Sequence, residues 1–104
     1  MRIESIGGFD WDEGNRKKCE KHGVSVRAIE EVFARALSIE PDSFADEERI
    51  RVIGTTSAGR YVFLVFTLRT RDGAVLIRPI SARYMHRREV RWYEEEKNSG
   101  VQER

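Results

Sequence analysis

The sequence contains a single cysteine and no long apolar run, and each shortage excludes a class of protein. The lone cysteine, Cys19, cannot form an internal disulfide, which fits a reducing cytoplasm, and we expect the protein to reside there. No apolar run approaches the roughly 18 residues that a membrane span needs, so we expect no membrane partner. With only two histidines beside this cysteine, a tetrahedral zinc site would require several carboxylates, and we expect neither a metal nor another cofactor.

The size of the chain indicates one small folded unit. A chain of 104 residues is expected to form a single domain, residues 1–104, with a frayed tail at 98–104. Its hydrophobic content of 39% supports a globule with one modest core.

The charges are strongly segregated, although the net charge is only +1. Residues 30–48 hold seven acids, whereas residues 60–91 hold eight arginines and no lysine. Arginine favours bidentate contacts to phosphate. Each charge taken singly fits a solvated surface, but the arginines taken together indicate a polyanionic partner.

Two helices are expected in the first third of the chain. Asp10 or Asp12 can cap the first helix, and Gly23 suits the left-handed residue that ends it. Ser25 can cap the second helix, whose apolar residues recur at the spacing of a buried helical stripe. A loop should then run from Pro41 through the acidic residues that follow it.

Three strands are expected in the second half. Residues 49–53 alternate, with both arginines on one face, and residues 61–66 are continuously apolar, which predicts a central strand covered on both faces. Residues 71–73 form a strong hairpin signal, and the next strand should span 74–80. Because Pro79 lacks an N–H group, the end of that strand should lie at an edge or a bulge.

A third helix is expected from near Ser81 to about Lys97. A short additional strand near Ile3 to Gly7 would make a fourth. The order is therefore two N-terminal helices, an antiparallel sheet of three or four strands and a closing C-terminal helix, which is an α+β fold.

The segment 77–89 is the most informative part of the chain, because it is interpreted as a strand that ends in a helix start. Cations and free backbone N–H groups at such a start favour a phosphate, so Arg78 and Arg83 together form the predicted phosphate clamp. His86 and Glu89, three positions apart, can supply proton transfer beside it. The alternative is that they satisfy each other, or a neighbouring backbone group, on a half-buried face.

Two further pairs of residues suit the same chemistry. Lys21 and His22 offer a phosphate-neutralising cation and an acid/base group, or simply charges that favour a helix C-terminus. Glu48 and Arg49 offer a general base and a phosphate ligand, or a surface ion pair of little energetic value. Cys19 and His22 have a metal-like spacing, but Cys19 is better explained as a small core residue.

Four groups of residues stand in a specific order and spacing. They are Trp11-Asp12-Glu13-Gly14-Asn15, Lys21-His22-Gly23-Val24-Ser25, Glu48-Arg49 with Ile53-Gly54, and Ile80-Ser81-Ala82-Arg83 followed by Glu89 and Tyr93. This ordered set resembles the BrnT family over roughly residues 9–96. Two positions depart from the family pattern, since Cys19 stands where asparagine is frequent and Pro79 replaces an aliphatic residue.

The resemblance implies a RelE-like fold and a ribonuclease toxin of a bacterial type II toxin–antitoxin module, which inhibits translation. The implied partners are an RNA substrate and a BrnA-like ribbon-helix-helix antitoxin, with operator DNA bound only through the complex. By motif position, the resemblance places eight residues on recurrent family positions: Lys21, His22, Glu48, Arg49, Arg78, Arg83, Glu89 and Tyr93.

The leading hypothesis is a metal-independent endoribonuclease, in which the RNA 2′-hydroxyl attacks the adjacent phosphorus. This reaction needs a base, an acid at the leaving oxygen and cations that hold the developing charge. The expected base is His22 or Glu48. Lys21, or His86 in its cationic form, would assist at the leaving group.

Arg49 and Arg83 are expected to stabilise the phosphate, and Arg83→Ala should then remove a factor of ~100 or more in cleavage rate. A non-catalytic RNA-binding or antitoxin-binding co-repressor would present the same basic face, and a purely structural interaction domain would neither bind nor cleave RNA. The expected RNA-binding and supporting residues are Arg78, His86, Arg87, Arg88, Glu89 and Tyr93.

Overall fold

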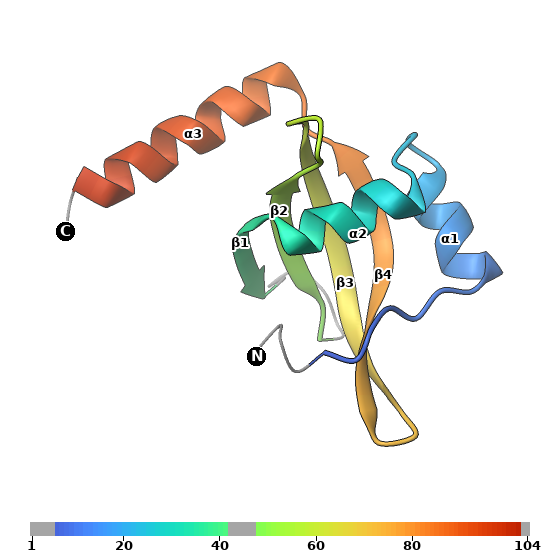
Figure 1. Ribbon diagram of the computed structural model, residues 1–104. Coiled ribbons are helices and arrows are strands. Elements are labelled where there is room, and N and C mark those ends of the chain that lie inside the picture. Colours follow the sequence, from blue (N-terminus) through green and yellow to red (C-terminus); the bar gives the residue numbers. More distant parts are fainter. Residues whose placement is uncertain (1–5, 42–47, 103–104) are drawn as a thin grey trace.

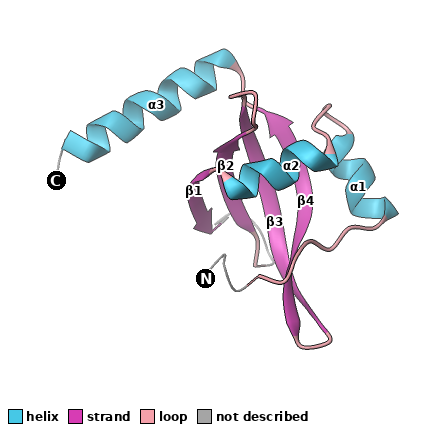
Figure 2. Ribbon diagram, viewed as in Figure 1, coloured by secondary structure: helices cyan, strands magenta, loops and turns pink. Residues whose placement is uncertain are grey.

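The structure, a computed structural model, describes residues 6–41 and 48–102. Its elements are α1 (Glu13–Glu20), α2 (Val26–Ala34), β1 (Ala36–Pro41), β2 (Ile50–Thr55), β3 (Tyr61–Arg71), β4 (Ala74–Tyr84) and α3 (Arg87–Gln102). The strands form one antiparallel sheet in the order β1-β2-β3-β4 (Figures 1 and 2). The expected α+β class is confirmed, with two N-terminal helices, a four-stranded sheet and a C-terminal helix.

Both N-terminal helices begin where the sequence predicts. The Asp12 side chain accepts a hydrogen bond from the backbone N–H of Asn15, and the Asn15 side chain accepts one from the backbone N–H of Asp12. This reciprocal pair is a capping box. Gly23, with φ of +86°, lies in the turn after α1. The Ser25 hydroxyl accepts from the backbone N–H of Ala28 and so caps α2.

β1 is a strand that the sequence did not reveal. It follows α2 almost directly and pairs with β2 at the edge of the sheet. The loop expected from Pro41 onward falls largely on residues 42–47, outside the described part of the chain. The additional strand expected near Ile3 to Gly7 also falls partly outside it, since the description begins at residue 6; Phe9 makes a parallel bridge with β4.

The core lies between the sheet and the helices α1 and α2, which lie on one face of the sheet (Figure 1). Its largest fully buried side chains are Phe66, Ile29, Leu64, Val24, Val32, Val52, Val62, Pro79 and Cys19. Gly54 lets α2 approach β2 closely, because a Cβ atom there would lie 2.7 Å from the carbonyl oxygen of Val32.

β3 is central in the sheet, as expected, but the expectation that it is covered on both faces is wrong. Its inner residues Val62, Leu64 and Phe66 are fully buried. On the opposite face Val65 is buried, but Phe63 is only half-buried, because α1 and α2 pack on the inner face alone. The sheet therefore has an outer face that remains largely open.

The expected helix start near Ser81 is wrong, because β4 continues to Tyr84 and α3 begins only at Arg87. The last residues of β4 pair with Val62 and its neighbours in β3. Pairing with the apolar central strand outweighs the local preference of this segment for helix.

A β-bulge lies in the middle of β4. The pairing of β3 with β4 skips Ile80, next to Pro79, so the expected bulge at this proline is confirmed, although it lies within the strand and not at its end. Side chains alternate along a strand, so two residues five positions apart normally face opposite sides. The extra residue reverses this rule, and Ile77 and Ala82 both lie in the core.

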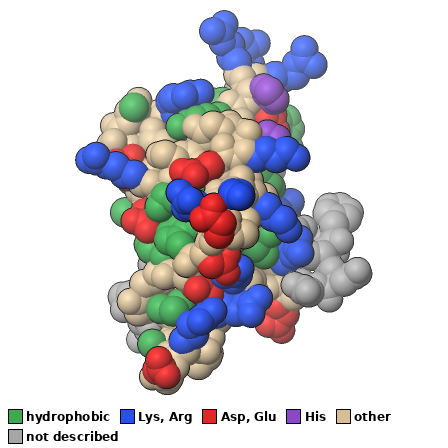
Figure 3. Space-filling view, turned by 90° about the vertical axis from the view of Figure 1, so that its right-hand side faces the viewer, with side chains coloured by type: hydrophobic (Ala, Val, Ile, Leu, Met, Phe, Trp, Pro, Cys, Tyr) green, Lys and Arg blue, Asp and Glu red, His purple; other side chains and the backbone are tan. Residues whose placement is uncertain are grey.

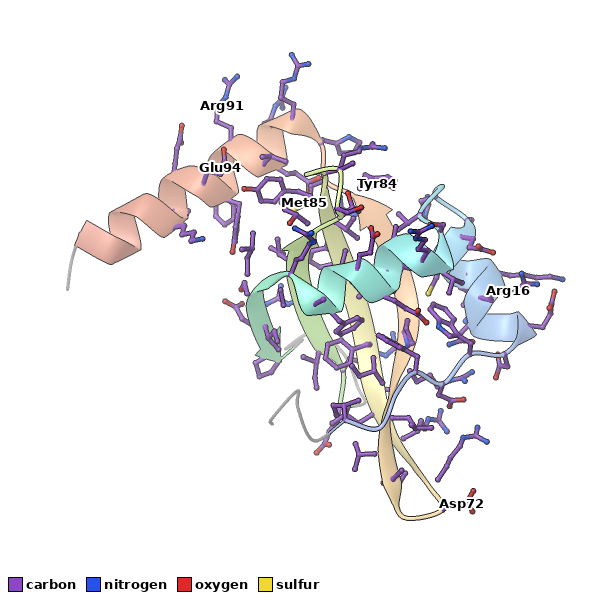
Figure 4. All side chains as sticks on the ribbon, viewed as in Figure 1. Arg16, Asp72, Tyr84, Met85, Arg91 and Glu94 are labelled. Carbon is purple, nitrogen blue, oxygen red and sulfur yellow. The ribbon has the colours of Figure 1, made fainter. Side chains whose placement is uncertain are left out.

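α3 continues to Gln102, beyond the expected end near Lys97, and projects away from the sheet (Figure 1). The Tyr61 hydroxyl donates to the Glu94 carboxylate at 2.8 Å, and the rings of Tyr61 and Tyr93 meet edge to face at 6.2 Å. Arg91 points away from the sheet, whereas Asp72 marks the tip of the β3–β4 hairpin (Figure 4). Within residues 6–41 and 48–102, none of the helices is long and apolar enough to cross a bilayer.

Candidate functional site

The outer face of the sheet gathers arginines from three strands. Alternate residues of a strand face the same side, and the bulge at Ile80 keeps Arg78 and Arg83 on the same face of β4. The register of β2 with β3 likewise directs Arg51 to the side of Val65, away from the core. We call this surface the arginine face; its members are Arg49, Arg51, Arg69, Arg78 and Arg83.

Two hollows lie on the arginine face. The larger, which we call the groove, has a volume of about 880 Å³ and lies between the sheet and α3. The smaller, which we call the basic pocket, has a volume of about 240 Å³ and lies where α1 meets the sheet. The residues that line the groove include Arg51, Phe63, Arg83, Arg88, Glu89, Trp92 and Tyr93. The basic pocket contains Asn15, Lys18, Arg49, Thr67, Arg69, Arg78 and Ile80.

Arg83 and Glu89 form a bidentate ion pair in the groove. The two guanidinium nitrogens of Arg83 donate to the two carboxylate oxygens of Glu89 at 2.7 and 2.8 Å, and the backbone N–H of His86 donates to the same carboxylate at 2.9 Å. The Arg83 bond and then the His86 N–H lower the pKa of Glu89 to about 2. Glu89 is therefore ionised at neutral pH, so it orients Arg83 and is unsuited to act as a proton donor.

The aromatic residues of the groove complete its walls. Burial raises the pKa of the Tyr93 phenol above its ordinary value, so the phenol stays neutral near pH 7. The Arg83 guanidinium lies 5.1 Å from the centre of the Phe63 ring, within the range of a cation–π contact. Met85 lies between the end of β4 and α3 (Figure 4).

The basic pocket collects cations from four separate segments of the chain. Lys18 comes from α1, Arg49 from the residue before β2, Arg69 from β3 and Arg78 from β4. Among the described residues that line the pocket, none is a carboxylate. The Arg49 Nε atom is buried and lacks a hydrogen-bond partner in the described part of the chain. Concentrated positive charge with an unused donor favours an anionic ligand.

Arg78 is held in place from behind by two carboxylates. It donates to Asp10 at 3.3 Å and to Asp12 at 2.9 Å, and its side chain is 18% exposed. The pKa of Asp12 is lowered by the backbone N–H of Asn15 and then by Arg78. Lys and Arg side chains interleave with Asp and Glu over the side of the molecule that carries α1 and β4 (Figure 3). These contacts fix Arg78 before any ligand arrives.

Asn15 links α1 to the bulged strand. Its buried side-chain amide donates to the backbone oxygens of Asp10 and Pro79, both at 2.9 Å. Glu48 lies beside the pocket on its other side, where its backbone oxygen accepts from the Thr67 hydroxyl at 2.9 Å and its side chain is exposed. The two contacts position opposite walls of the basic pocket.

The structure does not bring Arg78 and Arg83 together as one clamp. Arg83 lines the groove, whereas Arg78 lines the basic pocket. They are five residues apart along β4, which corresponds to roughly 15 Å. Arg49 lies with Arg78 in the basic pocket, so the structure places Arg49 and Arg83 in different hollows.

Five predicted site residues line neither hollow: Glu48, beside the basic pocket, and four that lie further away. Lys21 and His22 are exposed in the turn after α1, and His86 and Arg87 are exposed where β4 leads into α3. The alternative interpretation of His86 and Glu89 matches the structure, because the Glu89 carboxylate accepts a hydrogen bond from the backbone N–H of His86. Their other predicted roles stay predictions.

Sequence reasoning missed part of the site. Lys18, Thr67 and Arg69 line the basic pocket, but none of them was a candidate. The available signal was spacing, because Thr67 and Arg69 are alternate residues of one strand, as are Arg49 and Arg51 of its neighbour.

Cys19 behaves as the core residue that its sequence context predicts. It is fully buried, and burial raises the pKa of its thiol to about 11, which leaves little nucleophilic thiolate at neutral pH. Within the described ranges, no three or more His, Cys, Asp or Glu residues gather where they could hold a metal ion.

The chain matches a protein-family model whose description is "Ribonuclease toxin, BrnT, of type II toxin-antitoxin system". The match covers residues 11–89, from the end of the N-terminal segment through Glu89, and thus includes every residue that lines the basic pocket. A search of curated proteins gave no match.

Proposed function

The chain belongs to the BrnT family of ribonuclease toxins from type II toxin–antitoxin systems, and on this basis we propose that it is itself a metal-independent endoribonuclease. Its substrate is RNA, and cleavage inhibits translation in the cytoplasm. Its neutralising partner is a BrnA-like ribbon-helix-helix antitoxin, through which the complex reaches operator DNA.

One observation carries the proposal: four cations converge on one hollow of the outer sheet face, and three of them, Lys18, Arg49 and Arg69, have no ion pair among the described residues. Proteins generally hold single-stranded nucleic acid on a positively charged surface that follows the phosphate backbone of the nucleic acid. Arginine suits the task because its planar fork matches two phosphate oxygens at once.

We place the scissile phosphate in the basic pocket. Arg49 and Arg78 stabilise the negative charge that develops on its oxygens, and Asp10 and Asp12 hold Arg78 in position. Preorganised donors of this kind act most strongly when they need no rearrangement during the reaction.

Proton transfers complete the reaction. Glu48, whose backbone oxygen accepts from the pocket residue Thr67, uses its carboxylate to take the proton of the 2′-hydroxyl as that oxygen attacks phosphorus. The Lys18 ammonium, which lines the pocket, donates a proton to the departing 5′-oxygen. The products are a 2′,3′-cyclic phosphate and a 5′-hydroxyl, so atoms and charge balance without an added reagent. Lys21 and His22, exposed beyond the pocket, remain alternative proton carriers.

The decisive experiment incubates the pure protein with RNA in EDTA and compares two substitutions. Arg49→Ala is expected to lower the cleavage rate by ~100-fold. Arg83→Ala is expected to lower it less, because Arg83 lies roughly 15 Å from Arg78 along β4 and reaches only a neighbouring phosphate. Arg27→Ala is the matched control, since its side chain is 91% exposed on α2.

The outcomes separate three interpretations. The reverse order of effects would move the scissile phosphate to the groove and to Arg83. Salt-sensitive RNA binding without cleavage would identify a non-catalytic binding module. Cleavage that EDTA abolishes would contradict the metal-independent mechanism.

A further inference from the structure

Two of the exposed large hydrophobic side chains of the described chain line the groove. Leu37, on β1, is 41% exposed and Trp92, on α3, is 62% exposed. A third, Ile39, is 38% exposed but pairs with Val52 and so lies on the other face of the sheet. Exposed hydrophobic residues scattered singly are ordinary, but a cluster of them marks an interaction surface.

The elements that form this surface have few partners within the molecule. β1 pairs only with β2 among the described strands, so no described strand lies along its other edge. Proteins usually cover or pair such an edge. α3 meets the sheet through a few side chains, of which Tyr61 and Arg83 supply the hydrogen bonds. The groove therefore lies between β1 and α3, and a segment docked there would pack against both.

The charges of the groove point to a partner with acidic flanks. Arg51 is paired with Glu40 at 3.4 Å and Arg83 with Glu89 at 2.7 Å, so these four charges largely cancel. Three further charges line the groove without an ion pair among the described residues: Arg88, Glu96 and Lys97. This remainder is positive by one charge, and on the same helix Arg87 and Arg91 are exposed near its start whereas Glu94 and Glu95 are exposed further along.

We propose that the groove is the docking site of the antitoxin, and that the docked part is an amphipathic segment. Its apolar side chains fill the space between Leu37 and Trp92, and its acidic residues meet Arg88 and Lys97. A protein segment fits better than RNA because both sheet arginines of the groove are already paired with carboxylates, Arg51 with Glu40 and Arg83 with Glu89, which leaves few cations for phosphates. The antitoxin then occupies the groove, beside the basic pocket and not within it.

The inference rests on the proposed function in one respect, namely that this chain has an antitoxin. The probe is the small protein encoded by the adjacent reading frame, purified with the toxin and separated from it. Trp92→Asp and Leu37→Asp are expected to weaken its binding about 30-fold or more, as for a buried aromatic or aliphatic hot spot. Trp92→Phe should restore most of the affinity. Thr70→Asp is the control, because it adds the same charge at an exposed position outside the groove.

The readouts are the dissociation constant from calorimetry, the oligomeric state by light scattering and RNA cleavage by the same variants. Unchanged antitoxin affinity in both aspartate variants would overturn the proposal. A wild-type dimer that Trp92→Asp converts to monomer would assign the groove to a second copy of the chain instead. Loss of RNA binding in step with antitoxin binding would assign it to RNA. If the wild-type protein binds the antitoxin but cleaves no RNA, the proposed nuclease activity is refuted and the proposed docking site is not.

Discussion

Replacing Glu89 by glutamine removes the charge of the ion pair in the groove while keeping nearly the same shape. Arg83 then loses its bidentate carboxylate, and the backbone N–H of His86 keeps only a neutral acceptor. We expect Glu89→Gln to be less stable than the wild type at neutral pH and to release the Arg83 guanidinium for other anions.

The size of the effect follows from the pKa of Glu89, which falls from an ordinary 4.5 to about 2. The full shift corresponds to about 3 kcal/mol. That value is an upper bound, because the side chains of Arg83 and Glu89 are 39% and 36% exposed and water screens their attraction. About 1 kcal/mol remains after this discount, which is about 4–8 °C in melting temperature for a domain of this size.

The dependence on pH provides the sharpest check. Because the folded pKa of Glu89 is depressed, its stabilisation is present above pH 4.5 and is lost as the pH falls toward about 2. Melting curves of wild type and Glu89→Gln should therefore converge between these values. Glu95→Gln, at an exposed position of the same helix, controls for the loss of one carboxylate. A difference that stays constant from pH 7 to pH 2 would refute the reasoning.

Two further substitutions test how the sheet and helices are joined. Gly54→Ala should lower the free energy of unfolding by about 1–3 kcal/mol, because the new Cβ would meet backbone oxygens of Val32 and Arg35 at 2.7 and 2.9 Å; a urea midpoint equal to that of the wild type would contradict this close approach. Asn15→Ala should cost about 2–3 kcal/mol, because it removes the amide that satisfies the backbone oxygens of Asp10 and Pro79; calorimetric melting measures it, and a loss below about 0.5 kcal/mol would show that water replaces the amide.

Features set by a few neighbouring residues were predictable from the sequence. Asp12 and Ser25 cap their helices because a short oxygen-bearing side chain reaches the free N–H groups of the first turn. Asp72 and Gly73 turn the β3–β4 hairpin because both adopt positive φ angles, +52° and +81°. The family resemblance, which rests on ordered short motifs, is confirmed by the match over residues 11–89.

Features set by distant residues were not predictable in the same way. Residues 81–84 carry no strong strand signal of their own and become strand because β3 requires a neighbour. β1 is also short, with 6 residues, and among the described strands it pairs only with β2. The start of the last helix was expected near Ser81 but lies at Arg87. Arg78 and Arg83 were therefore wrongly expected to lie together at a helix start.

The candidate site was predictable by residue type more than by grouping. Arg49 and Arg78 were candidates from their charge and position, and the structure puts them in one pocket. Lys18 joins them because α1 packs against β4, and Arg69 joins them because the side chains of β3 alternate between the two faces of the sheet. Both depend on tertiary structure. The roles of Glu48 and Arg83 stay predictions that the cleavage assays will decide.

The bulge at Ile80 makes the length of β4 matter as much as its composition. If Ile80 were deleted, the pair Phe66–Pro79 would be followed directly by the pair Val65–Ser81, and the ladder would become regular without turning any side chain over. A single deletion elsewhere in β4, with the bulge kept, would turn one half of the strand over relative to the other. Ala82 would then face away from the core and the guanidinium of Arg83 would face into it, where an unpaired charge is costly. The bulge is therefore the position at which this strand can lose one residue and keep its two faces.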